Sequence, residues 1–235
     1  MDTRAILNKR ISLCPNIHAI SYKTITLFEA LNSIRKGVYQ MQIMNIRKLL
    51  QNGNIQSYIS EKKNLPSFIF AGIAFCNRHK FDISGYTSLM IVDIDKVENL
   101  EQAKAMLISD KFVVSVWISP SGNGLKALLY LNYKDRINED YWIFHEYCAF
   151  PQIANYFMTT YGIQIDKTGA DITRLCFVSY YREIHLKNEF EPFPIDITLT
   201  NKQIWKIRNK YYYGSKSVRK AISIEKKISK LLKNE

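Results

Sequence analysis

Residues 89–131 carry the pattern that most limits how this chain can fold. Leu89–Val92 is an apolar, largely β-compatible run, and Phe112–Ile118 and Leu125–Leu131 are two more. Between the first two runs, Asn99 can cap a helix. The order strand, helix, strand, tight turn, strand predicts a βαβ unit with a right-handed crossover, followed by a hairpin.

The rest of the sequence divides into a body, residues 1–200, and a basic helical tail, residues 201–235, with Asn201 as the predicted helix cap. Within the body, residues 1–63 form a largely helical N-terminal part, and residues 64–185 form the core. We therefore expect an α+β (α/β) fold with a mixed or antiparallel sheet and flanking helices. Residues 139–161 are expected to form one long helix, and short strands are expected near 11–13 and 19–22.

The charge of the chain is concentrated at one end. The tail holds 11 Lys and Arg against 2 Glu, a net charge of +9, whereas the whole chain of 235 residues carries +12. A basic tail on a nearly neutral body indicates a polyanionic partner, most simply nucleic acid. The alternative is a solvated or partner-binding helix that packs through Ile222 and Leu231.

Composition also indicates the compartment. No apolar run approaches the roughly 20 residues of a membrane span, and the first ten residues lack the apolar core of a signal peptide. We expect a cytoplasmic protein with no membrane partner. The scattered cysteines predict reduced, mostly buried thiols; they are Cys14, Cys76, Cys148 and Cys176.

The first candidate site follows the run Leu89–Val92. Asp93 and Asp95 are separated by one residue, so in a strand they point to the same side of the sheet. Two neighbouring carboxylates repel each other and favour a cation between them. Hard divalent ions such as Mg²⁺ bind carboxylate oxygens and substrate phosphates. The pair is a candidate metal site, and the alternative is an exposed strand end.

The second candidate is the turn Ser119-Pro-Ser-Gly-Asn-Gly-Leu-Lys126. Gly122 and Gly124 allow backbone N–H groups to approach a phosphate closely. Ser119, Ser121 and Lys126 add donors and a positive charge. The turn follows the strand Phe112–Ile118, and we expect this strand to pair beside the Asp93/Asp95 strand. The alternative is an ordinary turn, because any hairpin needs one.

The third candidate is the segment Asp166–Phe177. It supplies one more carboxylate, from Asp166 or Asp171, and Arg174, which can clamp a triphosphate with two parallel hydrogen bonds. The alternative is a surface pair between Asp171 and Arg174. Three acids, a glycine turn with lysine and an arginine together suit two-metal nucleotidyl transfer.

In this order, the motifs Asp93-Ile-Asp95, Ser-Pro-Ser-Gly-x-Gly-Leu-Lys126 and Asp166-x4-Asp-x2-Arg174-Leu-Cys-Phe resemble the VirE-type N-terminal, primase-polymerase-like domain of the archaeo-eukaryotic primase superfamily. The resemblance covers roughly residues 60–185. It implies an RRM-like sheet beside an N-terminal α/β unit. It also implies that Asp93 and Asp95 bind Mg²⁺ or Mn²⁺ with Asp171 or Asp166. Lys126 would stand where many relatives have a phosphate-contacting histidine.

The expected function is metal-dependent, template-directed addition of nucleotides during replication of DNA or a mobile element. Expected partners are single-stranded or primed DNA and nucleoside triphosphates, with a separate helicase as a further candidate. The alternatives are a non-catalytic nucleic-acid-binding module of a mobile element, which the lysine at 126 favours, and a metal-dependent nuclease. A zinc site at Cys76, His79, His145 and Cys148 is a weaker alternative.

Overall fold

The computed structural model describes residues 1–74, 78–80, 83–95, 97–134 and 140–214, with side chains described as far as residue 210. The chain divides into two compact units, Met1–Asp196 and Ile197–Glu235, which are described separately. The domain boundary expected from the sequence, between residues 200 and 201, lies just after this division.

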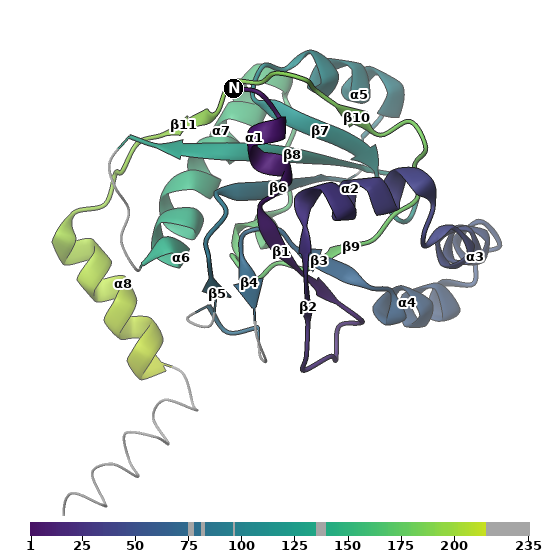
Figure 1. The fold of residues 1–235 in the computed structure, drawn as a ribbon, viewed down its shortest axis with the longest axis horizontal. Coiled ribbons are helices and arrows are strands. Elements are labelled where there is room, and N and C mark those ends of the chain that lie inside the picture. The colour runs from purple at the N-terminus through teal and green to yellow at the C-terminus, as the bar shows by residue number, and fades with distance from the viewer. Residues whose placement is uncertain (75–77, 81–82, 96, 135–139, 215–235) are drawn as a thin grey trace, which may run out of the picture. The chain divides into compact units, whose positions relative to one another are not determined.

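A sheet of five strands forms the centre of the first unit (Figure 1). The strands are β6 (Leu89–Ile94), β7 (Val113–Ile118), β8 (Leu125–Tyr133), β10 (His185–Leu186) and β11 (Phe193–Ile195). β8 lies between β6 and β7 and is antiparallel to both. β10 is antiparallel to β7, whereas β11 runs parallel to the end of β8. The sheet is therefore mixed, and the α+β class is confirmed.

The strand order corrects one expectation. We expected the strand 112–118 to pair beside the Asp93/Asp95 strand, but β8 lies between them. Both β6 and β7 are antiparallel to β8, so they are parallel to each other, and helix α5 (Leu100–Ser109) connects them past the central strand. The βαβ unit is thus split: β8, the hairpin partner of β7, pairs along its other edge with β6.

A second, antiparallel sheet lies in the same unit. Its strands, in spatial order, are β2 (Lys23–Thr26), β1 (Arg10–Cys14), β3 (Ser67–Ile69) and β9 (Cys176–Phe177). A short antiparallel pair, β4 (Ile73–Ala74) and β5 (Ile83–Ser84), completes the described strands. The N-terminal strand expected at 19–22 begins instead at Lys23. Because β9 begins two residues after Arg174, this sheet anchors the third candidate segment.

Four helices cover the N-terminal part, as the sequence predicts in outline. They are α1 (Arg4–Leu7), α2 (Leu27–Lys36), α3 (Gln40–Gln51) and α4 (Ile55–Asn64). Thr26 caps α2 in a capping box with Glu29, and Gly37 ends it in the left-handed conformation, at φ 72°. Asn99 likewise accepts a hydrogen bond from the backbone N–H of Gln102 at the start of α5.

The long helix expected at 139–161 is interrupted. It consists of α6 (Tyr141–Phe144), the π-helical turn η2 (His145–Ala149) and α7 (Phe150–Tyr161). Pro151 lies just after the π-helical turn, at a point where proline removes a hydrogen bond from a continuing helix. A 3₁₀ turn, η3 (Lys167–Ala170), follows. In the second unit, Thr200 rather than Asn201 caps α8 (Asn201–Gly214), because Thr200 and Gln203 exchange hydrogen bonds.

One face of the large sheet packs into the main core. Leu89 and Ile91 of β6 and Leu128 of β8 join residues of α1, α2 and the second sheet in one buried cluster. Asp93 and Lys126 continue these alternating positions toward the strand ends, so they lie at the border of the core. Of the expected thiols, Cys14, Cys148 and Cys176 are buried in the reduced state, and Cys76 lies outside the described residues. In the described part of the chain, no helix has the length and apolar character needed to span a membrane.

Candidate functional site

A cavity of about 650 Å³ lies where the two sheets meet. It collects side chains from all three candidate segments, which are far apart in sequence. The predicted site residues among those lining the cavity are Asp93, Asp95, Ser119, Ser121, Lys126, Asp171 and Arg174. Gly122, Gly124 and Asp166 do not line it. Asp93 of β6 and Asp95, which directly follows β6, both line the cavity, as strand alternation predicts.

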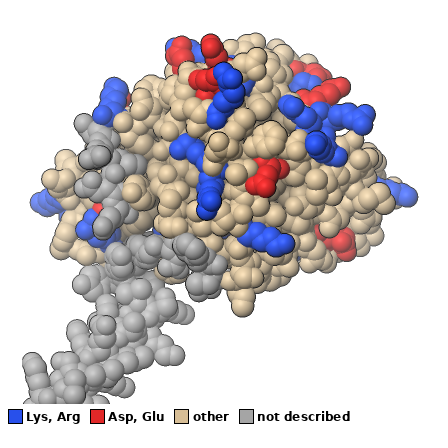
Figure 2. Space-filling view, viewed as in Figure 1, with Lys and Arg blue, Asp and Glu red and all other residues tan. Residues whose placement is uncertain are grey.

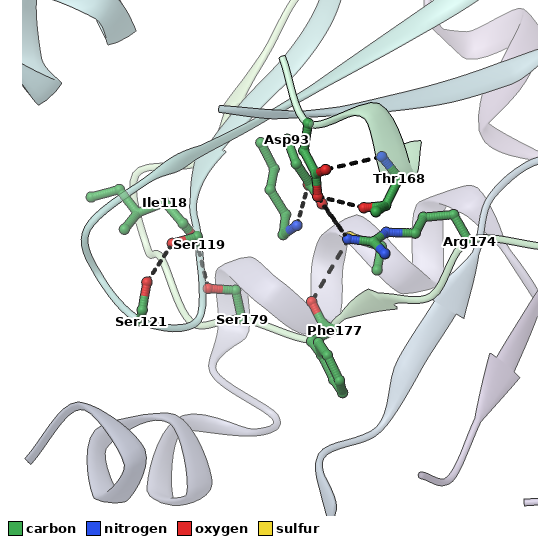
Figure 3. A network of polar contacts seen from close by, with 11 residues as sticks. Asp93, Ile118, Ser119, Ser121, Thr168, Arg174, Phe177 and Ser179 are labelled. Carbon is green, nitrogen blue, oxygen red and sulfur yellow. Dashed lines mark hydrogen bonds and ion pairs between the residues drawn. The ribbon is translucent and has the colours of Figure 1, made fainter. Parts of the chain in front are cut away.

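Asp93 is held by two cations. It lies directly opposite Lys126 across the β6–β8 ladder, and Nζ of Lys126 contacts Oδ1 of Asp93. Nη2 of Arg174 lies 3.6 Å from the other oxygen, Oδ2. Figure 3 shows Arg174 pointing toward Asp93. Burial lowers the pKa of Lys126, but the nearby Cys176 and Asp93 outweigh burial and leave this pKa above its ordinary value.

Asp95 is exposed and lies against the glycine turn. A Cβ atom at position 124 would lie 2.7 Å from the carbonyl oxygen of Ile94 and 3.0 Å from Oδ1 of Asp95. Only glycine leaves room for the end of β6 at this point. Gly124 is therefore required for strand packing beside Asp95, independently of any phosphate contact.

The turn between β7 and β8 is held by a side chain from helix α3. Figure 3 shows Ser119 and Ser121 side by side, with their hydroxyl oxygens 3.0 Å apart. Gly122 has a φ of 88°, a conformation that favours glycine. Arg47 of α3 donates hydrogen bonds to the carbonyl oxygens of Pro120, at 3.1 Å, and of Ser119, at 3.2 Å. Sequence reasoning missed this arginine, because nothing in a helical pattern marks a long-range contact.

The third segment is tied to the end of β6. The backbone N–H of Asp166 donates to the carbonyl oxygen of Asp93 at 3.1 Å. Thr168 donates two hydrogen bonds to the Asp166 carboxylate, and Arg174 lies 3.1 Å from it. Burial raises the pKa of Asp166, but these hydrogen bonds and the Arg174 charge lower it below its ordinary value. Asp171 accepts two hydrogen bonds from Thr173, and Arg174 pairs with Asp93 and Asp166, so the alternative of a surface pair between Asp171 and Arg174 is not the arrangement here.

Arg174 retains a donor for an anion. Its Nε atom is buried and has no hydrogen-bond partner among the described residues. Three further cations line the cavity: Lys62, Arg78 and Lys167. The unpaired Arg174 donor and the cations around the cavity both favour an anion, such as a phosphate oxygen.

Glu146 lines the cavity and is another residue that the sequence did not single out. Its carboxylate pairs with Lys80 at 2.5 Å and accepts a hydrogen bond from the backbone N–H of Ile172 at 3.3 Å. Burial raises the pKa of Glu146, although Lys80 lowers it. Glu146 lies in the π-helical turn η2, and such turns often occur at functional sites.

The neighbouring His145 faces the interior instead. Its Nδ1 lies 2.9 Å from the hydroxyl oxygen of Tyr86, and burial lowers its pKa to about 3. Cys148 is buried nearby; of the other pair in the zinc hypothesis, His79 is half-buried and Cys76 lies outside the described residues. No described residue therefore adds support to a zinc site.

The donor chemistry of Asp93 and Asp95 fits a hard divalent ion, because both offer carboxylate oxygens on one face of one strand. Within the described ranges, no three side chains of His, Cys, Asp or Glu come together as a metal-binding group. Asp166 and Asp171 therefore do not complete a three-acid cluster with the first pair.

Comparison with models of protein families matches residues 60–184 to the family described as BT4734-like, N-terminal domain. The match covers more than half of the 235 residues. The chain belongs to this family. The part matched to the BT4734-like N-terminal domain contains every predicted site residue, whereas Arg47 lies before it. Searches of curated proteins and of solved structures found no match to the chain.

Proposed function

We propose that this chain is a primase-polymerase-like domain of the archaeo-eukaryotic primase type, which adds nucleotides to a nucleic-acid 3′-hydroxyl. The observation that carries the proposal is the shared cavity of Asp93, Asp95, the Ser119–Ser121 turn, Lys126 and Arg174. The three candidate segments are far apart in the sequence, but all of them line this one cavity. The acids lie at the end of one strand, and hydrogen-bond donors that suit phosphate lie around them.

Each residue has a chemical role in this proposal. Arg174 and Lys126 bind and orient the triphosphate, and Ser119 and Ser121 add hydroxyl donors. Asp93 and Asp95 hold Mg²⁺ or Mn²⁺ together with phosphate oxygens. When bound, the ion lowers the pKa of the attacking hydroxyl and neutralises the leaving pyrophosphate. A third acid, Asp166 or Asp171, would have to approach this pair on metal binding, because neither forms a cluster with it among the described residues.

A second candidate function is a non-catalytic module that binds nucleic acid. The pairing of Asp93 with Lys126 and Arg174 favours it, because a neutralised carboxylate needs no metal ion. In that case the cavity would bind phosphates only through its cations. A metal-dependent nuclease would use the same acids, and only its products would differ.

A primer-extension assay separates these functions. The protein is incubated with a labelled primed template, nucleoside triphosphates and Mg²⁺ or Mn²⁺, and the products are resolved on a gel. We expect extension of the primer. Cleavage would indicate the nuclease, and a gel shift without new products would indicate the binding module.

Two substitutions test the assigned acids. Asp93→Asn and Asp95→Asn should each lower extension about a hundredfold or more, as the loss of a preorganised charge at a reacting centre does. Asp196→Asn is the matched control, since Asp196 pairs with Lys134 on the surface. Full extension by both site variants would remove Asp93 and Asp95 from the reaction.

A further inference from the structure

Lys126 and Asp93 form an ion pair inside the cavity. Both side chains are largely buried, with 8% of Lys126 and 12% of Asp93 exposed. Together with Arg174, Lys126 places one cation at each oxygen of the Asp93 carboxylate. Lys126 and Asp93 face each other in register, so the pair is built into the sheet.

This arrangement conflicts with metal binding at Asp93. A divalent ion on the same carboxylate would lie beside the Lys126 ammonium, and the repulsion between these charges is weakly screened at a buried position. Asp95 differs, because it is exposed and has no ion pair in the part of the chain that is described. Without a ligand, Asp95 is therefore the unpaired carboxylate of the Asp93/Asp95 pair.

A triphosphate would change this balance. It brings several negative charges into a cavity where Arg174 holds an unpaired Nε and Lys126 has three N–H donors. Phosphate oxygens would compete with Asp93 for both cations.

We propose that Lys126 exchanges partners: without nucleotide it is the counter-ion of Asp93, and a bound triphosphate draws it away and frees Asp93 for a divalent ion. The proposal rests on the proposed function, since it takes a nucleoside triphosphate as the ligand. It predicts that nucleotide and metal ion favour each other's binding, because coupling between two sites is reciprocal.

The variant Lys126→Met tests the exchange with two readouts that move in opposite directions. Without nucleotide, we expect it to bind Mn²⁺ about tenfold tighter than the wild type, within the usual range of coupling between sites. In EDTA, we expect it to bind a fluorescent non-hydrolysable nucleotide about tenfold more weakly. Electron paramagnetic resonance measures free Mn²⁺, and fluorescence anisotropy measures nucleotide binding.

The matched control is Lys111→Met, because Lys111 pairs with Glu191 on the surface and should change neither affinity. A folded Lys126→Met protein that binds Mn²⁺ no tighter than the wild type, or nucleotide equally well, would overturn the exchange. A purely structural role for Lys126 would not strengthen one ligand while weakening the other.

Removing only the lysine leaves Asp93 buried without its partner, which destabilises a protein strongly. If Lys126→Met does not fold, the double variant Asp93→Asn/Lys126→Met removes both charges. It should bind Mn²⁺ without nucleotide as the wild type does, because Asp93 is not yet a ligand. Loss of Mn²⁺ binding in the double variant would contradict the exchange. The Mn²⁺ titration needs no catalysis, so it can fail or succeed independently of primer extension.

Discussion

At the scale of single residues, Asp93 and Arg174 show how one carboxylate organises a site. A buried ion pair contributes little net stability, but loss of one partner is costly. Here two cations share one acid, and Arg174 also reaches Asp166. These acids hold the cations in place, and the proposed exchange requires the cations to leave them when a triphosphate binds.

Arg174→Ala should weaken the binding of a non-hydrolysable nucleoside triphosphate by about 1–3 kcal/mol, the range for charge-assisted hydrogen bonds. The reason is the loss of the buried Nε donor and of the charge at the cavity. Isothermal titration calorimetry measures the affinity. Arg182→Ala is the matched control, because Arg182 is exposed and does not line the cavity. Equal affinities of the two variants would exclude Arg174 as a phosphate contact.

The buried His145 predicts a pH dependence of stability. Its pKa is about 3 in the fold, against 6.5 when exposed, so only the unfolded chain gains its proton between these values. Stability should fall as pH drops below 6.5, by up to about 2 kcal/mol at pH 5 from this residue.

Urea unfolding at pH 7 and pH 5 measures this loss, and His145→Gln should remove that part of it. His18→Gln is the control, since His18 is not buried. An identical pH dependence in His145→Gln and the wild type would show that His145 accepts a proton in the folded protein.

At the scale of elements, the turn between β7 and β8 is positioned by its neighbours. Helix α3 holds its carbonyl groups through Arg47, and Ser179 donates to the carbonyl oxygen of Ile118 at 2.7 Å (Figure 3). The turn is thus bound to both the N-terminal helices and the chain after β9. The N-terminal part outside the family match therefore helps to shape the site.

Gly124→Ala tests this packing. The added Cβ would meet the Ile94 carbonyl oxygen at 2.7 Å, so the turn and the end of β6 must separate. We expect a loss of about 1–3 kcal/mol, typical of overpacking, and weaker Mn²⁺ binding, because Asp95 moves with the strand end.

Gly53→Ala is a suitable control for Gly124→Ala. Nothing lies within 4 Å of a Cβ there, and only the φ of 71° opposes alanine. Urea unfolding gives the stability of both variants. Unchanged stability and Mn²⁺ affinity in Gly124→Ala would mean that the turn yields without affecting Asp95.

At the scale of the whole molecule, charge separates the body from the tail. On the face in Figure 2, basic and acidic side chains are interspersed, consistent with a body of low net charge. The tail, residues 201–235, holds +9 of the total +12. Helix α8 forms the first part of the tail, and its Trp205 is exposed. Residues 215–235, which include the expected packing positions Ile222 and Leu231, lie outside the described residues.

Deletion of residues 201–235 should weaken binding to single-stranded DNA and flatten its salt dependence. Lysines follow phosphates and aromatic rings stack on bases, and each neutralised phosphate adds about −0.7 to the slope of log affinity against log salt. Nucleotide binding should persist, because every proposed contact lies in the first unit. Fluorescence anisotropy at several salt concentrations and thermal unfolding test this. A large loss of stability with an unchanged salt slope would indicate a structural tail instead.

Local interactions in the sequence determined much of this protein. Thr26 with Glu29, Gly37 and Asn99 mark helix ends because caps satisfy backbone groups within a few residues. Strand alternation placed Asp93 and Asp95 on one side for the same local reason. The α+β class and the three candidate segments followed from such patterns.

Only the tertiary structure decided what those segments contact. The position of β8 between β6 and β7 placed Lys126 opposite Asp93, where the sequence alone suggested a phosphate contact. Arg47 and Glu146 reach the site through packing between distant segments. Strand order and register depend on which hydrophobic faces and free edges meet when the whole chain folds, and no short-range pattern encodes that choice.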